Sequence, residues 1–197
     1  MFKGGVFLKK VLLMLAEGFE EVEALTVVDY LRRKDIECDT CSITEEKKVE
    51  GAHRIVVEAD KCLKDISDKD YDGIILPGGL PGATNLRDDD RVIELIKEFN
   101  KSKKLIAAIC AAPIVLERAK VIGGKDVTSY PGTENELTSG NYKEDLVVRD
   151  GHIITARGPA VAVYFALEIV SYFLGEDIKE DLGKEILLDM VENKVKK

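Results

Sequence analysis

The sequence lacks any apolar run that approaches the length needed to cross a lipid bilayer. It also lacks a disulfide framework, because its four cysteines are irregularly spaced, and this favours a reducing compartment, the cytoplasm. The hydrophobic part of residues 1–9 is too short for a secretory signal peptide, so we expect an N-terminal extension there. Repeats, low-complexity tracts and linkers are missing too, which predicts a single α/β domain over residues 10–197.

Basic residues are fewer than acidic residues. The chain has 29 Lys and Arg residues against 37 Asp and Glu residues, which gives a net charge of -8. A surface of that sign repels phosphate backbones and anionic lipids, so we expect no nucleic-acid and no membrane partner. Hydrophobic residues make up 45% of the chain and charged residues 34%, as in an ordinary globular domain.

Metal-ligand spacing is limited to one pair, Cys38 and Cys41. Positions three apart on a strand point to opposite faces, so these thiols should not meet, and no second ligand pair follows. Cys62 carries no signal beyond packing. His152 comes directly after the turn signal Asp150-Gly151 and is interpreted as an exposed hairpin residue. We therefore expect no metal and no cofactor.

Apolar runs alternate with amphipathic segments along the chain. The patterns predict strands at 10–16, 36–43, 72–76 and 105–109, an extended or hairpin segment at 47–57, a brief strand at 127–128 and a hairpin at 146–156. They predict helices at 19–34, 88–100, 113–120, 159–174 and 176–195. Buried strands that alternate with helices indicate a mostly parallel sheet covered on both faces.

One cysteine stands where a predicted strand meets a helix. The apolar run 105–109 ends on Cys110, and Pro113 suits the first turn of a helix. Ala108, Ala111 and Ala112 leave room around the thiol, as in a nucleophile elbow. The N-terminus of the helix would favour the thiolate. The alternative is that Cys110 is a small buried core residue without chemistry.

Two other predicted strands end near unusual residues, and active sites gather at the carboxyl ends of parallel strands. Glu23 follows the first strand on the same helical line as Phe19, Val27 and Tyr30, so burial would raise its pKa and let it donate a hydrogen bond to the sulfur. The alternative is a solvated glutamate of the first helical turn, as we expect of Glu20 and Glu21.

The third predicted strand ends at Gly78 and Gly79. Glycine lets the backbone approach a ligand closely, so the two N–H groups can point into a cleft. Together with the N–H of Ala111 they would form an oxyanion hole. A double glycine alone is weak evidence, and its value here is its place at a strand end of the same sheet as Cys110.

The chain resembles the ThiJ/PfpI superfamily, and within it the branch of the parkinsonism-associated protein deglycase and its bacterial relatives. The resemblance rests on several motifs in the same order: A-E-G-F-E-E-V-E-A (16–24), V-V-D-Y-L-R-R (27–33), Y-D-G-I-I-L-P-G-G (71–79), G-A-T-N-L (82–86), L-I-A-A-I-C-A-A-P (105–113) and T-A-R-G-P (155–159).

This resemblance implies a flavodoxin-like fold, a three-layer α/β/α sandwich, and a homodimer. It makes Cys110 the reactive, oxidisable cysteine and Glu23 its hydrogen-bonding acid, with Gly78, Gly79 and Ala111 on the oxyanion side. A polar residue of the other subunit borders the pocket in this branch, and His53 falls loosely at that position.

The chain departs from the family pattern in three places. I-C-A-A-P stands where the protease-like branch has I-C-H-G-P, so a histidine beside Cys110 is missing. Tyr130 stands where this branch often has a histidine before proline, and a phenol is a poor general base near pH 7. Tyr130 is therefore an auxiliary that donates a hydrogen bond or positions a ligand. The sequence after Arg157-Gly158 also leaves the usual G-P-G-T continuation.

Two functions are implied by the resemblance. The first is an enzyme of stress response, a glutathione-independent glyoxalase or protein deglycase, in which the Cys110 thiolate attacks a reactive carbonyl and Glu23 moves protons. The alternative is a non-enzymatic redox sensor and chaperone, in which Cys110 is oxidised to sulfinic acid.

Overall fold

A computed structural model describes residues 9–195 of the chain. Except for Lys9, the extension expected over residues 1–9 lies outside the described residues.

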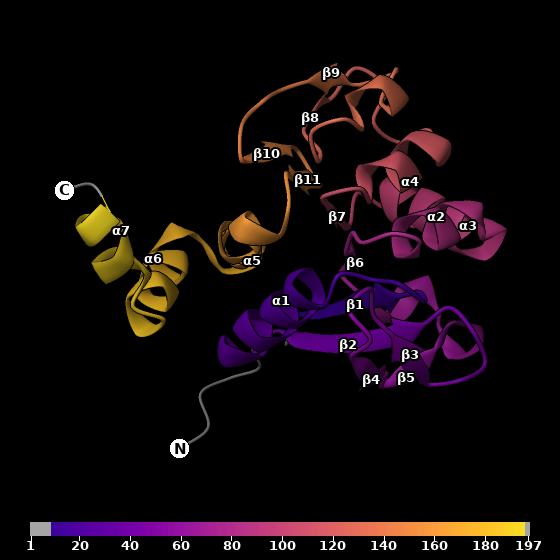
Figure 1. Ribbon diagram of the computed structural model, residues 1–197, viewed down its shortest axis with the longest axis horizontal. Coiled ribbons are helices and arrows are strands. Elements are labelled where there is room, and N and C mark those ends of the chain that lie inside the picture. Colours follow the sequence, from indigo (N-terminus) through magenta and orange to yellow (C-terminus); the bar gives the residue numbers. More distant parts are fainter. Residues whose placement is uncertain (1–8, 196–197) are drawn as a thin grey trace.

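A seven-stranded sheet forms the centre of the molecule (Figure 1), in the order β10-β11-β7-β6-β1-β2-β5. Every neighbouring pair is parallel except β10 and β11, which form an antiparallel hairpin at one edge. The strands are β1 (Lys10–Leu15), β2 (Glu37–Ser42), β5 (Lys61–Cys62), β6 (Gly73–Leu76), β7 (Leu105–Ile109), β10 (Val147–Asp150) and β11 (Ile153–Ala156).

Helices cover both faces of this sheet, because its central strands are apolar on both sides. In β1, Val11 and Leu13 belong to one buried cluster, and Leu12 and Met14 to the other. The first cluster packs under α1 (Glu21–Arg33) and α5 (Ala162–Leu174), which lie side by side (Figure 1). The second packs under α2 (Gly82–Asp88), α3 (Asp90–Lys101) and α4 (Pro113–Arg118). The predicted three-layer α/β/α fold is confirmed.

Smaller elements complete the described part of the chain. β3 (Lys48–Glu50) and β4 (Val56–Glu58) form an antiparallel hairpin, which confirms the hairpin predicted there. β8 (Asp126–Val127) pairs with β9 (Asn141–Tyr142). The 3₁₀ turns are η1 (Leu63–Asp65), η2 (Asp68–Asp70), η3 (Glu134–Glu136) and η4 (Pro159–Val161). None of the helices in residues 9–195 has the length and apolar character of a membrane span.

The predicted helix at 176–195 is wrong, because the segment forms two helices, α6 (Glu176–Glu185) and α7 (Leu188–Val195). Leu187 adopts a positive φ of 60° between them, and its N–H donates to the carbonyl of Lys184. This left-handed residue ends the α-helical hydrogen-bond ladder. The segment that forms α2 was missed, since four of its seven residues are polar or charged and it has no clear apolar period.

His152 is also placed differently from the prediction. It is buried rather than exposed, and its Nε2 lies 2.8 Å from Oδ1 of Asn100. The reason is that β11 pairs with the central strand β7, so the residue before it enters the sheet: the His152 carbonyl accepts a bond from the N–H of Ile106. The prediction for Cys38 and Cys41 is confirmed, because the two thiols lie in the clusters on opposite faces of the sheet.

Candidate active site at the carboxyl ends of three strands

The strands β1, β6 and β7 are neighbours in the sheet, so the segments that follow them meet at one edge. Cys110 follows β7 and adopts a positive φ of 63°. Its N–H donates to the carbonyl of Ala156 at 2.9 Å, and its carbonyl accepts from the N–H of Tyr130 at 2.8 Å. A side chain in this conformation costs about 1–3 kcal/mol, so the surrounding backbone must hold it there.

Glu23 lies in the first turn of α1 and is fully buried, not solvated. Its Oε2 accepts a hydrogen bond of 2.7 Å from the N–H of Gly78. Its Oε1 has no hydrogen-bond partner among the described residues. Burial raises the pKa of this carboxyl to about 7, against the opposing effect of the Gly78 N–H. The group therefore exchanges a proton readily near neutral pH.

Gly78 separates the two side chains and contacts both. A Cβ at this position would lie 2.6 Å from Cβ of Cys110 and 2.8 Å from Oε2 of Glu23, so a larger residue does not fit. Its N–H is donated to Glu23 and therefore points away from the oxyanion position expected for it. The N–H groups of Gly79 and Ala111 instead face the Cys110 sulfur and favour its ionised form.

The Cys110 thiol is harder to ionise than the elbow pattern predicts. Burial raises its pKa to about 12, and the negative charge of Glu23 adds to the effect, while the N–H groups of Ala111 and Gly79 oppose it. The helix that follows has only the six residues of α4 and does not outweigh these effects. The two groups titrate as a pair, because a proton on Glu23 removes the repelling charge and so lowers the pKa of the thiol.

Tyr130 donates its backbone N–H to the carbonyl of Cys110, and the residue is 49% exposed. The ring lies against Gly158, where an added Cβ would come within 3.2 Å of it. Together with Leu146 and the segment 157–161, it lines an apolar cavity of about 330 Å³. Arg157 donates to the carbonyl of Glu144 at 2.8 Å. These contacts make the Tyr130 ring part of the wall of this cavity.

A pair of residues near the site was missed by the sequence analysis. Glu21 is buried rather than solvated, because the loop between β3 and β4 folds over it. The backbone N–H of His53 donates to its Oε1 at 2.7 Å, and Nδ1 of the same histidine lies 2.8 Å from its Oε2. Gly51 offered a signal, since a side chain there would collide with the Glu21 carboxyl.

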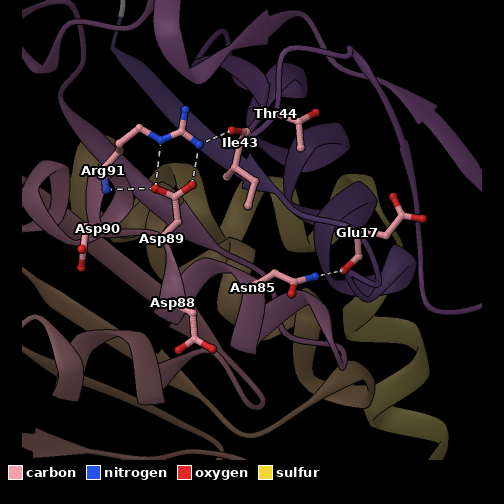
Figure 2. Close-up of a pocket in the computed structure, with 8 residues that line it drawn as sticks. All are labelled: Glu17, Ile43, Thr44, Asn85, Asp88, Asp89, Asp90 and Arg91. Atoms are coloured by element: carbon pink, nitrogen blue, oxygen red, sulfur yellow. Dashed lines mark hydrogen bonds and ion pairs between the residues drawn. The ribbon is translucent and has the colours of Figure 1, made fainter.

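A cavity of about 560 Å³ lies elsewhere (Figure 2). The Asp89 carboxylate is paired with the Arg91 guanidinium, which also donates to the carbonyl of Ile43. Asn85 donates to the carbonyl of Glu17. The lining residues include no cysteine or histidine, and so lack the thiol on which the expected chemistry depends. The candidate active site is therefore the pair formed by Cys110 and Glu23.

Comparison with known proteins identifies the family of the chain. The model of the DJ-1/PfpI family matches residues 9–172. The Parkinson disease protein 7 homolog of Danio rerio is 35% identical over 184 residues, which cover 91% of this chain and 97% of that protein. The crystal structure of Drosophila melanogaster DJ-1beta superposes with a TM-score of 0.89 at 34% identity, covering 92% of this chain and 98% of that one. The structure of oxidized Toxoplasma gondii DJ-1 gives a TM-score of 0.87 at 31% identity, with coverage of 91% and 98%. Since these matches run through nearly the whole chain, the protein belongs to the DJ-1/PfpI family.

Proposed function

We propose that the protein is a cysteine-dependent stress-response enzyme that acts on reactive carbonyls, as a glutathione-independent glyoxalase or protein deglycase. The observation that carries this proposal is the buried carboxyl of Glu23, with a pKa of about 7, beside the Cys110 thiol. A nucleophile and a proton carrier that titrates near the working pH are the groups that this reaction requires.

The reaction with methylglyoxal begins when the Cys110 sulfur bonds to the aldehyde carbon. The electron pair of the C=O bond moves to the oxygen, which takes the thiol proton and gives a hemithioacetal. Glu23 then removes the proton from this carbon, and a proton is returned to the neighbouring carbon. The hemithioacetal hydroxyl gives up its proton and the ketone oxygen takes one up, so the first carbon becomes the thioester carbonyl and the second carries the new hydroxyl. Water cleaves the resulting thioester, which releases lactate and restores the thiol. Glyoxal gives glycolate in the same way.

Backbone groups support two parts of this route, the stabilisation of the oxygen and the position of Glu23. The N–H groups of Gly79 and Ala111 face the sulfur, where they would stabilise the oxygen that gains charge next to it. Gly78 holds Glu23 in place through its own N–H. Tyr130 is not needed as a base, because Glu23 carries the proton. Early glycation adducts on protein side chains present a similar carbon to the same sulfur.

The test is methylglyoxal consumption by the purified protein. Cys110→Ser and Glu23→Leu should each abolish it. Cys62→Ser is the matched control, because Cys62 is buried and its sulfur bonds only the carbonyl of Glu45 among the described residues. Normal turnover in either active-site variant would discard the mechanism.

A second function is favoured by one specific observation, the buried Oε1 of Glu23 without a partner among residues 9–195. In the role of a redox sensor and chaperone, two molecules of peroxide convert the Cys110 thiol into a sulfinic acid and are reduced to water. A protonated Glu23 would then donate a hydrogen bond to one sulfinic oxygen. A relative from Toxoplasma gondii has been described in an oxidized form.

Intact mass after limited peroxide treatment should show two added oxygens, confined to Cys110. Oxygen on other cysteines would contradict this function.

We also propose that the chain forms a homodimer. Val22 and Leu25 on α1 are exposed, as are Ile55 and Val56 at the β3–β4 hairpin. Covering such apolar side chains is favourable in water. Light scattering should give twice the mass of the chain, and Val22→Asp with Ile55→Asp should reduce it to the monomer mass. A wild-type monomer would refute the proposal.

A further inference from the structure

The beginning of α1 meets the loop between β3 and β4, and three side chains with metal-binding atoms gather there. Glu20 and Glu21 come from the start of the helix, and His53 comes from the loop. One donor atom from each lies within 4.8 Å of the other two. None of the three belongs to the pair formed by Cys110 and Glu23, so a site built from them does not depend on the proposed function.

Glu21 is held in place by the loop backbone. Its Oε1 accepts hydrogen bonds from the N–H groups of His53, at 2.7 Å, and Ile55, at 3.4 Å. Gly51 makes room for the carboxyl, because any side chain at this position would overlap it. The second oxygen, Oε2, is directed at the His53 ring. Oε1 is thus held by backbone N–H groups, and Oε2 is free to bind an ion that lies between it and Nδ1 of His53.

Glu20 provides a second carboxylate, which has few polar contacts among the described residues. Its side chain is 15% exposed, and within residues 9–195 its single ion pair is with Nδ1 of His53, at 3.7 Å. A carboxylate that is largely withdrawn from water needs a compensating positive charge. The His53 ring is 67% exposed and supplies at most one charge to two carboxylates. The group therefore keeps an excess of negative charge.

We infer that Glu20, Glu21 and His53 form a site for a divalent transition-metal ion of the zinc class. Nδ1 of His53 lies 2.8 Å from Oε2 of Glu21 and 3.7 Å from Oε2 of Glu20. Two ligands of a tetrahedral zinc ion are about 3.3 Å apart. The two distances bracket this value, so a small rotation of the exposed ring brings Nδ1 to ligand spacing from both carboxylates. The three donor atoms already lie within 4.8 Å of one another.

The chemistry of the donors selects the ion. Imidazole nitrogen suits zinc and its transition-metal neighbours, whereas magnesium and calcium prefer oxygen ligands only. The neutral ring would bind the ion through Nδ1, in place of the contact with Glu21, and carry its proton on Nε2. Three protein ligands and the exposed side of the ring leave the fourth position to water.

The experiment is calorimetric titration of the metal-free full chain with Zn²⁺. We expect one ion per chain, and His53→Ala should weaken the affinity about tenfold or more. His53 is exposed, so this variant is expected to fold. Glu17→Gln is the matched control for loss of a nearby carboxylate, and Cys110→Ser is the control for zinc on the reactive thiol. Both should bind zinc like the unaltered chain.

A second measurement identifies the nitrogen. The chain has only two histidines, so the imidazole NMR spectrum contains two sets of signals. Zinc should shift the set that is missing from His53→Ala and leave that of His152 in place, and Mg²⁺ in excess should not reverse the shift. Equal affinity in His53→Ala, loss of binding in Cys110→Ser, or displacement by Mg²⁺ would each overturn the inference.

Discussion

Replacing Glu23 by glutamine should stabilise the protein at alkaline pH while removing its activity. In the unfolded chain the carboxyl titrates near its ordinary value of 4.5, and in the folded protein burial raises this pKa to about 7. Between these values the folded state binds more protons than the unfolded state, so the free energy of unfolding falls as the pH rises. A shift of this size corresponds to about 3 kcal/mol. This cost is absent at pH 4 and fully present at pH 8.

Glutamine keeps the size of the side chain and an oxygen that accepts from the N–H of Gly78, but it never ionises. The stability difference between Glu23→Gln and wild type should therefore grow by about 3 kcal/mol from pH 4 to pH 8. In urea this is a change of about 1–1.5 M in the difference between the midpoints. The trend with pH is the test, because contacts made by the new amide change both ends of the range equally.

The assay is urea unfolding followed by far-UV circular dichroism at pH 4, 5, 6, 7 and 8. Glu180→Gln is the matched control, since Glu180 is exposed on α6 and its replacement should leave the difference from wild type independent of pH. A Glu23→Gln difference that stays constant across the range would refute the raised pKa of the buried carboxyl. The proton exchange in the proposed mechanism would then lose its basis.

Three further outcomes are expected. Gly78→Ala should lower methylglyoxal turnover about 100-fold with a retained far-UV spectrum, because the new Cβ must displace Cys110 and Glu23; unchanged kinetics would contradict the tight contact. Tyr130→Phe should keep turnover within about twofold, since no hydrogen bond of the phenol is found among the described residues and the ring packs on Gly158; a loss of more than about tenfold would make the hydroxyl part of the catalytic machinery. His152→Ala should reduce the free energy of unfolding by about 1–2 kcal/mol at pH 8 through the lost bond to Asn100. Because burial lowers the pKa of His152, this advantage of the wild type should shrink as the pH falls below about 6.5, and thermal melts at pH 5 and pH 8 measure it.

The sheet and its order of elements were accessible from the sequence because the signals were local. Apolar runs such as 105–109 are long enough to identify a strand. The turn signal Asp150-Gly151 identifies the hairpin of β10 and β11. The region between 82 and 88 was not accessible, since a short helix without an apolar period has no local signature. The break at Leu187 was also missed, because leucine rarely adopts a positive φ and so does not indicate the end of a helix.

The candidate site was accessible in part. That Cys110, Glu23 and the Gly78-Gly79 segment lie together followed from the rule that strand ends share one edge of a parallel sheet. The direction of single N–H groups did not follow: that of Gly78 is donated to a carboxylate that arrives from another element. Nor did the burial of Glu21, which depends on where the β3–β4 loop closes in three dimensions.

The two edge strands of the main sheet, β5 and β10, have features that disfavour aggregation through the sheet edges. β5 has only two residues, and β10 carries Arg149 and Asp150. An exposed ladder that is this short, or this charged, is a poor template for another backbone. We therefore expect that the folded protein does not form fibrils through β5 or β10 at high concentration. Two copies would associate through side chains rather than through backbone hydrogen bonds at these edges.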